Sequence, residues 1–191
     1  MPYSKDHKAQ TRRKILQSSY LLFTARGYEK ITINELMNHC HLTRGAFYAH
    51  FSSKAELYSE TLKFAATSSN LAKIKPESYT DKQWLKQLLD VYLSIEHING
   101  TRTCPLAFLA ADISTQDINA QRTYSKAYDN MNKTLLAYAN SYMDCSEYEI
   151  LSITAMIIGA VAIARTMQDE STAQKLLASC RKEAGLRLGN I

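Results

Sequence analysis

A recurring helix-start signal constrains this chain more than any other feature of its sequence. At four places a Ser or Thr stands three residues before a Glu or Gln at the head of an apolar run, which is the capping-box pattern. The four pairs are Thr32 with Glu35, Ser53 with Glu56, Ser146 with Glu149, and Ser171 with Gln174. Only six Gly and three Pro occur among 191 residues, so few positions interrupt a helix once it has begun. No strand-like alternation of useful length competes, and the sequence predicts an all-α protein of about nine helices.

The apolar spacing places these helices along the chain. We expect them at residues 8–25, 32–39, 43–50, 54–73, 81–98, 105–113, 117–143, 146–167 and 171–188. Gly27 is expected to end the first helix, and the break at residues 76–80 is the best domain boundary. We therefore expect an N-terminal domain over residues 1–53, a connecting helix over 54–75 and a second helical domain over 76–191.

The formal charge of the chain lies entirely in its first third. Residues 1–63 carry ten Lys and Arg against five Asp and Glu, a net charge of +5, whereas residues 64–191 carry thirteen of each sign. Four of the five His also fall in the first part. A basic end beside a neutral body favours a polyanionic partner for that end. A solvated basic face has the same composition, and charge alone does not separate the two.

Residues 32–50 have the proportions of a helix-turn-helix, with two short helices joined by a three-residue turn at residues 40–42. The side chains that can form a small core between the helices are Ile33, Leu36, Met37, Leu42, Ala46 and Phe47. The opposite face of the second helix presents Thr43, Arg44, Gly45 and Tyr48, with His50 at its end. Such groups can meet base edges and phosphates in a major groove, and Lys54 and the cluster at residues 12–14 can neutralise flanking phosphates. A helical hairpin without a ligand is the alternative.

Over most of residues 12–57 the chain resembles the tetracycline-repressor (TetR) family of regulators. The matching positions are Ile15, Leu22, Phe23, Gly27, Tyr28, Ile31, Thr32, Ile33, Leu36, Leu42, Thr43, Arg44, Gly45, Ala46, Phe47, Tyr48, His50, Phe51, Lys54 and Leu57. The resemblance implies that Thr43 and Arg44 meet base edges. It implies that phosphates are met by Thr32, Tyr48, His50 and Lys54. Together with Arg12 and Gly45, these residues are the predicted DNA-binding set.

The sequence departs from the family in the turn of the motif. Where the family usually has a Gly, this chain has His41. Glycine serves a turn in which φ is positive, and His tolerates that region better than most residues, although at some cost. We expect the turn to form with slight strain.

Metal binding and catalysis are the other chemistries to weigh. His39, Cys40 and His41 have the wrong spacing for a structural zinc site, and their side chains diverge from a helix-ending turn, so no metal or other cofactor is expected. The sequence contains no Gly-x-Ser-x-Gly, His-Glu-x-x-His, phosphate-loop or dinucleotide motif, which argues against an enzyme. The four Cys form no CxxC pair, and reduced thiols in a cytoplasmic protein fit them best.

Residues 150–164 form the most apolar stretch, which is shorter than a membrane span and typical of a buried helix. Its apolar side chains surround the helix nearly completely, so the helix has to be covered on every side. Two copies of the chain can achieve this in a four-helix interface, with Gly159 and Ala160 allowing close approach. Burial within one protomer is the alternative. The end of the chain resembles the dimerising helix pair of the TetR family.

The middle helices are rich in aromatic and Met side chains. Those expected to line a ligand cavity are Trp84, Tyr92, Phe108, Tyr124, Tyr128 and Met131. Such side chains are commonly core residues. The resemblance implies a ligand cavity at this place, so a core and a cavity are equally favoured. Cys104, at the start of the helix at Pro105, is an additional candidate for covalent sensing, because a helix N-terminus favours the thiolate. An inert buried thiol is the alternative.

These features predict a sequence-specific DNA-binding transcriptional regulator, a repressor that a small-molecule effector releases from its operator. The expected partners are double-stranded operator DNA, a second copy of the chain as a homodimer, and an unidentified small molecule, with no membrane. The alternative is a ligand-independent DNA-binding architectural protein, which a body without a cavity would favour.

Overall fold

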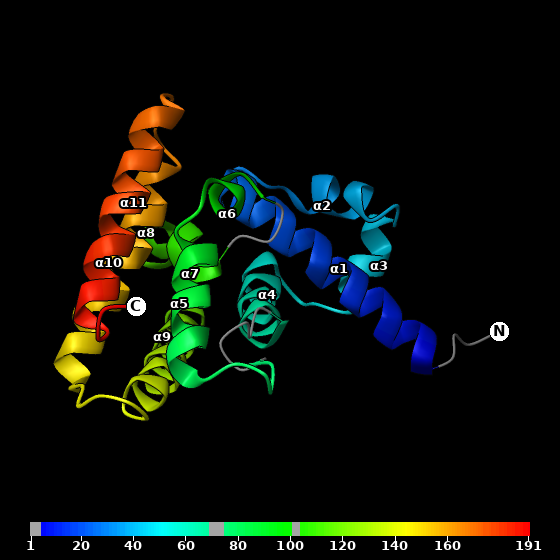
Figure 1. Ribbon diagram of the computed structural model, residues 1–191. Helices are drawn as coiled ribbons and strands as arrows, with labels where there is room; N and C mark the ends of the chain where they lie inside the picture. Colours follow the sequence, from blue (N-terminus) through cyan, green and yellow to red (C-terminus); the bar gives the residue numbers. More distant parts are fainter. Residues whose placement is uncertain (1–4, 69–74, 101–103) are drawn as a thin grey trace. The chain divides into compact units, whose positions relative to one another are not determined.

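The structure is a computed structural model that describes residues 5–68, 75–100 and 104–191. Over these ranges the chain forms eleven α-helices and no strand (Figure 1). The predicted all-α fold is therefore confirmed. The helix count exceeds the predicted one because two of the expected helices are each divided in two. The chain is organised as two compact units.

The first unit combines the N-terminal helices with residues 109–125. Its helices are α1 (Lys5–Arg26), α2 (Ile33–His39), α3 (Arg44–Tyr48), α4 (Lys54–Ser68), α8 (Ala110–Ile113) and the beginning of α9 (Ile118–Ala139). α1 lies against both α2 and α4, and α3 packs on α2 (Figure 1). The core of the unit includes Ile15, Phe23, Phe47, Phe51 and Leu57 together with Leu109, Ile113 and Ala120. Two segments that are far apart in the sequence thus share one hydrophobic core.

The second unit holds the remaining helices. These are α5 (Asp81–Tyr92), α6 (Ile95–Asn99), α7 (Pro105–Phe108), the rest of α9, α10 (Glu147–Ala164) and α11 (Glu170–Arg187). α10 runs along α11 and contacts α7, and α11 also contacts α5. α10 is long and apolar enough to cross a membrane by composition, but its inner face is buried in the core of this unit, as in the core helix of a soluble protein.

Two of the four predicted capping boxes start helices as expected. The Thr32 side chain accepts a hydrogen bond from the N–H of Glu35 at 3.1 Å, and Ser146 accepts one from the N–H of Glu149 at 3.2 Å. In each box the Glu carboxylate accepts the N–H of the capping residue in return. The starts of α2 and α10 therefore follow from local sequence alone.

At the other two helix starts the capping hydrogen bonds differ from the predicted pattern, although α4 begins at Lys54 as expected. At α4 the Ser53 hydroxyl accepts the N–H of Glu56, but the Glu56 carboxylate accepts from Ser52 instead of Ser53. α11 is capped by Asp169, whose carboxylate accepts the N–H of Ser171, so the helix begins earlier than expected. Asp is a strong N-cap residue, and here it is the better-placed acceptor.

Two predicted helices are interrupted. The expected helix at 81–98 ends as α5 at Tyr92, because the Ser94 hydroxyl accepts the N–H of His97 at 3.1 Å and starts α6. The expected helix at 105–113 is divided at Leu109, whose φ of −112° and ψ of 3° lie outside the helical region. The expected helix at 54–73 is observed as α4, and its last predicted residues lie outside the described part of the chain.

Candidate nucleic-acid interface

The turn between α2 and α3 sets the geometry of the helix-turn-helix. His41 has a φ of +55°, so the residue that replaces a Gly adopts the positive φ that the turn requires. The N–H of His41 donates to the carbonyl of Asn38, and the N–H of Leu42 donates to that of Met37, both at 2.9 Å. Phe47 of α3 is fully buried in the unit's core. The predicted motif is thus present, with its turn closed by backbone hydrogen bonds.

The outer side of α3 and its N-cap expose half of the eight residues predicted to contact DNA. Thr43 is the N-cap of α3, and its side chain makes no capping hydrogen bond. Arg44 and Gly45 are exposed, and 53% of Tyr48 is accessible to solvent. Arg44 Nη2 lies 3.5 Å from Tyr48 Oη, at the outer limit of a hydrogen bond. This helix therefore presents a hydroxyl, a guanidinium and a phenol on one short exposed element.

Thr32 is engaged at the start of α2. Its hydroxyl donates to Glu35 Oε2 at 2.8 Å, and Arg26 reaches the other carboxylate oxygen at 3.2 Å. Hydrogen bonds from the backbone N–H and the hydroxyl of Thr32, with a smaller contribution from Arg26, hold the pKa of the Glu35 carboxyl below its usual range. The predicted contact of Thr32 with a phosphate therefore has to be made beside a carboxylate.

Arg12 ties three parts of the first unit together. Its guanidinium donates to the backbone carbonyl of His50 at 2.8 Å and to Glu60 Oε2 at 2.9 Å. The same group lies over the ring of Phe51, 4.3 Å from its centroid. Glu60 was not singled out from the sequence, although it orients this arginine. Arg12 thus connects α1 with α4 and with the end of the α3 segment, and its predicted phosphate contact adds to this structural role.

His50 and Lys54 lie at the edge of α3, and both are half-buried. Burial lowers the pKa of the His50 imidazole, and the nearby charges of Lys8 and Arg12 lower it further. The Lys54 ammonium lies over the ring of Tyr28, 4.0 Å from its centroid. Burial lowers the pKa of Lys54, while Glu29 and Glu35 oppose that shift. The two side chains, both predicted to contact phosphates, thus lie among aromatic and charged neighbours within the unit.

The residues expected to line a ligand cavity are divided between the two units. Tyr124 packs against the core of the first unit, whereas Trp84, Tyr92, Cys104, Phe108, Tyr128 and Met131 belong to the second. Within the second unit, His97 connects two of them, because its ring lies 4.8 Å from the Tyr92 ring and 6.3 Å from the Phe108 ring. The Arg165 guanidinium lies over Phe108 at 3.9 Å. Sequence reasoning missed both His97 and Arg165, since no local pattern marks them.

Three other predicted residues have distinct surroundings. Tyr128 Oη lies 2.9 Å from the hydroxyl of the buried Thr154. Trp84 is buried and meets Tyr79 edge to face. Burial raises the pKa of the Cys104 thiol, although hydrogen bonds to Tyr92 and to backbone N–H groups oppose the shift. The raised pKa favours the protonated thiol, whereas the position at a helix start suggested a thiolate.

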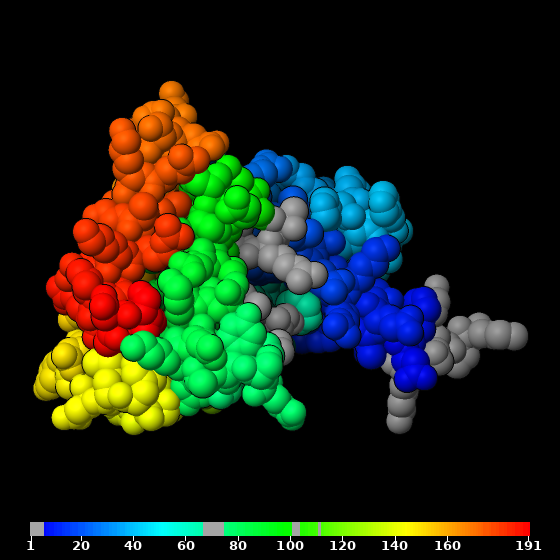
Figure 2. Space-filling view, in the orientation of Figure 1, coloured from blue at the N-terminus to red at the C-terminus, as the bar shows by residue number. Residues whose placement is uncertain are grey.

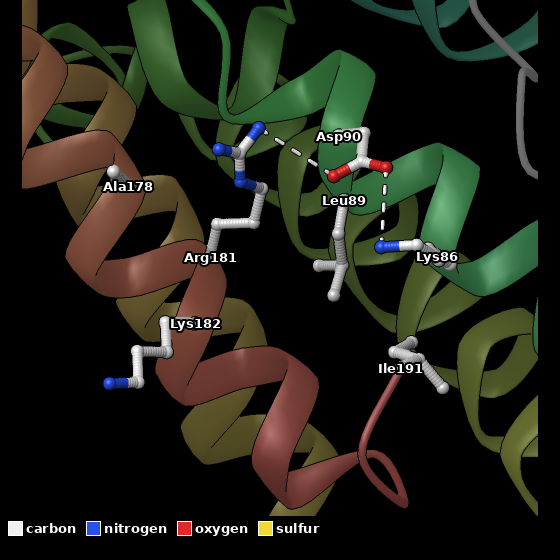
Figure 3. Close-up of a pocket in the computed structure, with 7 residues that line it drawn as sticks. All are labelled: Lys86, Leu89, Asp90, Ala178, Arg181, Lys182 and Ile191. Atoms are coloured by element: carbon white, nitrogen blue, oxygen red, sulfur yellow. Dashed lines mark ion pairs between the residues drawn. The ribbon is translucent and has the colours of Figure 1, made fainter.

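A shallow depression lies between α5 and α11 (Figure 3). It encloses about 190 Å³ and is lined by Lys86, Leu89, Asp90, Ala178, Arg181, Lys182 and Ile191. Asp90 pairs with Lys86 and with Arg181, each at 3.6 Å, in the ion pairs drawn in the figure. None of the predicted ligand residues borders this depression. In the described part of the chain, no group of three or more His, Cys, Asp or Glu is arranged to hold a metal ion.

Comparison with known proteins places the helix-turn-helix in a family. Residues 15–61 match the family model described as "Bacterial regulatory proteins, tetR family". The Transposon Tn10 TetC protein of Escherichia coli is 33% identical over 64 residues, which are 31% of this chain and 32% of that protein. The "Probable acrEF/envCD operon repressor" of Escherichia coli (strain K12) is 32% identical over 57 residues, 30% of this chain and 26% of that protein. The chain thus spans about a third or less of these curated relatives.

The likeness to solved structures extends over nearly the whole chain. A TetR transcriptional regulator from Legionella pneumophila has a TM-score of 0.78 and 17% sequence identity, covering 97% of this chain and 98% of that one. At this level of identity the likeness shows the fold. The family match thus covers residues 15–61, and the likeness in fold extends over nearly the whole chain.

Proposed function

Because this chain belongs to the TetR family of transcriptional regulators, we propose that it is a sequence-specific DNA-binding repressor that a small-molecule effector releases from its operator. The observation that carries the proposal is α3, which is fixed by buried Phe47 and exposes Thr43, Arg44 and Tyr48. Residues 1–63, which include α3, also carry a net charge of +5. The chain acts as a regulator rather than as an enzyme, and it works in the cytoplasm, where its DNA lies.

The proposed DNA contacts divide into two kinds. Thr43 and Arg44, at the start of α3, meet base edges in the major groove and supply specificity. The proposed phosphate contacts are made by Arg12, Thr32, Tyr48, His50 and Lys54. Gly45 lets the backbone approach DNA closely, since a Cβ there would meet little besides Thr43 within its own unit. Phosphate contacts supply affinity that depends on salt but not on sequence.

The test is to select random duplexes with the purified protein and to sequence those that are retained. A recovered motif of two half-sites one helical turn apart supports a dimeric operator-binding protein. Retention of DNA without any enriched motif would instead favour the architectural alternative. Failure to retain DNA at low salt would contradict the proposal altogether.

The dimer is proposed to form through α10 and α11. Residues of α11, orange to red in Figure 2, lie on the surface of the second unit. On α10, 83% of Tyr148 and 53% of Ile163 are exposed, and a Cβ at Gly159 would meet no atom within 4 Å. A second copy covers this apolar face in a four-helix interface. An interface of this obligate type buries more than roughly 2,000 Å².

The effector is proposed to bind in the helical body near Tyr92, Phe108 and Tyr128, with His97 joining the first two. These side chains are aromatic, and the body carries no net charge, which suits a weakly charged aromatic compound. An effector raises the thermal midpoint of the protein and weakens its binding to DNA, and DNA must weaken effector binding by the same factor because the coupling between two sites is reciprocal. A compound that stabilises the protein without changing its affinity for DNA is not an effector.

Cys104 separates two modes of sensing. If N-ethylmaleimide releases DNA from the wild-type protein but not from Cys104→Ser, the thiol takes part in the response. An equal response of both proteins would make Cys104 a bystander, as its raised pKa favours.

A further inference from the structure

Residues 109–125 join the first unit from a distant part of the sequence. Leu109, Ile113 and Ala120 are buried in the same core as the N-terminal helices. The segment is continuous at one end with α7 and at the other with the rest of α9, and both of these belong to the second unit. The chain therefore passes between the two units at both ends of this segment, in addition to the passage after Ser68.

Within this segment, Asp112 contacts the connection between α1 and α2. Asp112 Oδ2 accepts the backbone N–H of Tyr28 at 3.0 Å. Gly27, with a φ of +79°, allows the carboxylate to approach, because a Cβ at that position would lie 2.9 Å from the same oxygen. The carboxylate thus fixes the backbone at the residue where α1 gives way to the helix-turn-helix.

The side chain of Tyr28 carries this restraint toward the proposed DNA surface. Its ring meets the buried Tyr58 ring edge to face, with centroids 4.9 Å apart, and Phe23 at 5.8 Å. On Tyr28 lies the ammonium of Lys54, 4.0 Å from the ring centroid. A cation in this position is held by the ring as well as by the backbone of α4.

We propose that Asp112 is a positioning residue for DNA binding: by holding the backbone of Tyr28 it fixes the ring on which Lys54 is presented to a DNA phosphate. The inference rests on the proposed function. It adds a route by which the second unit influences DNA binding within a single protomer. When residues 109–125 shift, Asp112 leaves Tyr28, Lys54 loses its platform, and that protomer loses one phosphate contact. This effect does not require a change in the distance between two recognition helices.

The contact needs an acceptor at Asp112 and does not need its negative charge. The charges that raise the pKa of Lys54 are those of Glu29 and Glu35, which lie on the N-terminal segment. Asp112→Asn keeps an acceptor oxygen and removes the charge, whereas Asp112→Leu removes both. Tyr28→Leu removes the ring and keeps the backbone N–H. These three variants separate the hydrogen bond, the charge and the aromatic platform.

The binding experiment uses sonicated calf-thymus DNA, so that only the phosphate contribution is measured. Log affinity is plotted against log salt concentration for each full-length variant. Lys54→Ala is expected to reduce the slope by about 1, and Asp112→Leu and Tyr28→Leu by the same amount. Asp112→Asn is expected to match the wild type. The double variant Asp112→Leu with Lys54→Ala is expected to match Lys54→Ala alone, because the same contact is lost once.

A second measurement detects the contact between Lys54 and the Tyr28 ring in the absence of DNA. Because the Lys54 ammonium lies over the ring of Tyr28, we expect the ring to shift the NMR signals of the Lys54 side-chain methylenes upfield. This shift is expected to vanish in Asp112→Leu and Tyr28→Leu and to persist in Asp112→Asn. If Asp112→Leu does not fold, Tyr28→Leu and Asp112→Asn still carry the comparison.

The outcomes separate this inference from the proposed function. A wild-type protein that does not bind the DNA contradicts the proposed function, while the NMR shift still tests the positioning by Asp112. An unchanged Lys54 shift in Asp112→Leu overturns the inference, as does its loss in Asp112→Asn. Additive losses in the double variant also overturn it, since Asp112 would then act on DNA binding by another route.

Discussion

The side chains at the proposed DNA surface differ in what holds them. Arg44 is exposed on α3 and makes one long contact with Tyr48, so little restrains it before DNA arrives. Lys54, in contrast, lies on an aromatic ring, and Arg12 is held by a carbonyl, a carboxylate and a ring. Loosely held groups can adapt to base edges, whereas pre-positioned cations suit the regular phosphate backbone.

This difference gives opposite expectations for two alanine variants. Arg44→Ala should lose discrimination at one base position, worth about 1–3 kcal/mol if its contact to guanine is bidentate. Lys54→Ala should weaken binding to every sequence and flatten the salt dependence. Sequencing of selected duplexes and binding titrations over a range of salt measure the two effects. If Arg44→Ala retains the wild-type motif, the assignment of base readout to Arg44 is wrong.

His97 gives the second unit a dependence on pH. Burial lowers the pKa of its imidazole, so the folded state disfavours the protonated ring. A base whose pKa is lower in the folded state contributes stability above its unfolded pKa of about 6.5, and this contribution is lost as the pH falls through the folded value. The free energy of unfolding of the wild type should therefore decrease from pH 7 toward pH 5.

The variant His97→Leu should make that decrease shallower, and urea titrations at several pH values measure it. His39→Leu, at an exposed position on α2, is the matched control and should retain the wild-type slope. An equal slope in His97→Leu and the wild type would show that other groups cause the loss of stability.

The residues proposed to contact DNA were found from the sequence, whereas the residues that hold them in place were not. Thr43, Arg44 and Tyr48 belong to one short motif and can be found from local spacing. Asp112 contacts Tyr28 from 84 residues away, and Glu60 contacts Arg12 from 48 residues away. No periodicity connects partners at such separations, so these supporting contacts appear only once the chain is folded.

At the scale of helices, local capping chemistry predicted some helix starts and missed others. The boxes at Thr32 and Ser146 start α2 and α10 as expected. The interruption at Ser94 was hidden because apolar residues continue on both sides of it, at Leu93 and Ile95. Hydrophobic periodicity does not distinguish a hydroxyl that caps a helix inside an apolar run from a hydroxyl that faces solvent.

The two C-terminal serines provide a matched test of capping. Ser146→Ala should lower the free energy of unfolding by about 1 kcal/mol, because it removes the side-chain acceptor at the start of α10. Ser171→Ala should change it by no more than about 0.5 kcal/mol, because Asp169 caps α11 instead. Urea unfolding of both variants measures the difference. Equal losses would mean that the box at Ser146 contributes no more than an ordinary surface serine.

At the scale of the whole molecule, the exposed apolar face of α10 predicts a homodimer. Ile163→Glu should convert the dimer into a monomer, because the charge would be buried in the interface without a partner. Val91→Glu, at a position on α5 that is 42% exposed, is the control and should remain a dimer. Ile157 is a poor choice for this test, because it is only 5% exposed and its replacement would disturb the protomer itself.

Light scattering after size-exclusion chromatography at micromolar concentration measures the mass of each variant. A wild type that elutes with the mass of one chain would contradict the dimer. An unchanged dimer in Ile163→Glu would place the interface on another surface.

Because residues 109–125 belong to the first unit, that unit cannot be exchanged between proteins as one continuous stretch of sequence. A chimaera that grafts residues 1–68 onto an unrelated sensor would leave behind Leu109, Ile113 and Ala120, which complete the core of that unit. The transplanted part would expose apolar surface where these side chains belong. Residues 1–68 are therefore not expected to fold correctly on an unrelated sensor. An exchange of DNA specificity between relatives has to transfer residues 1–68 and 109–125 together.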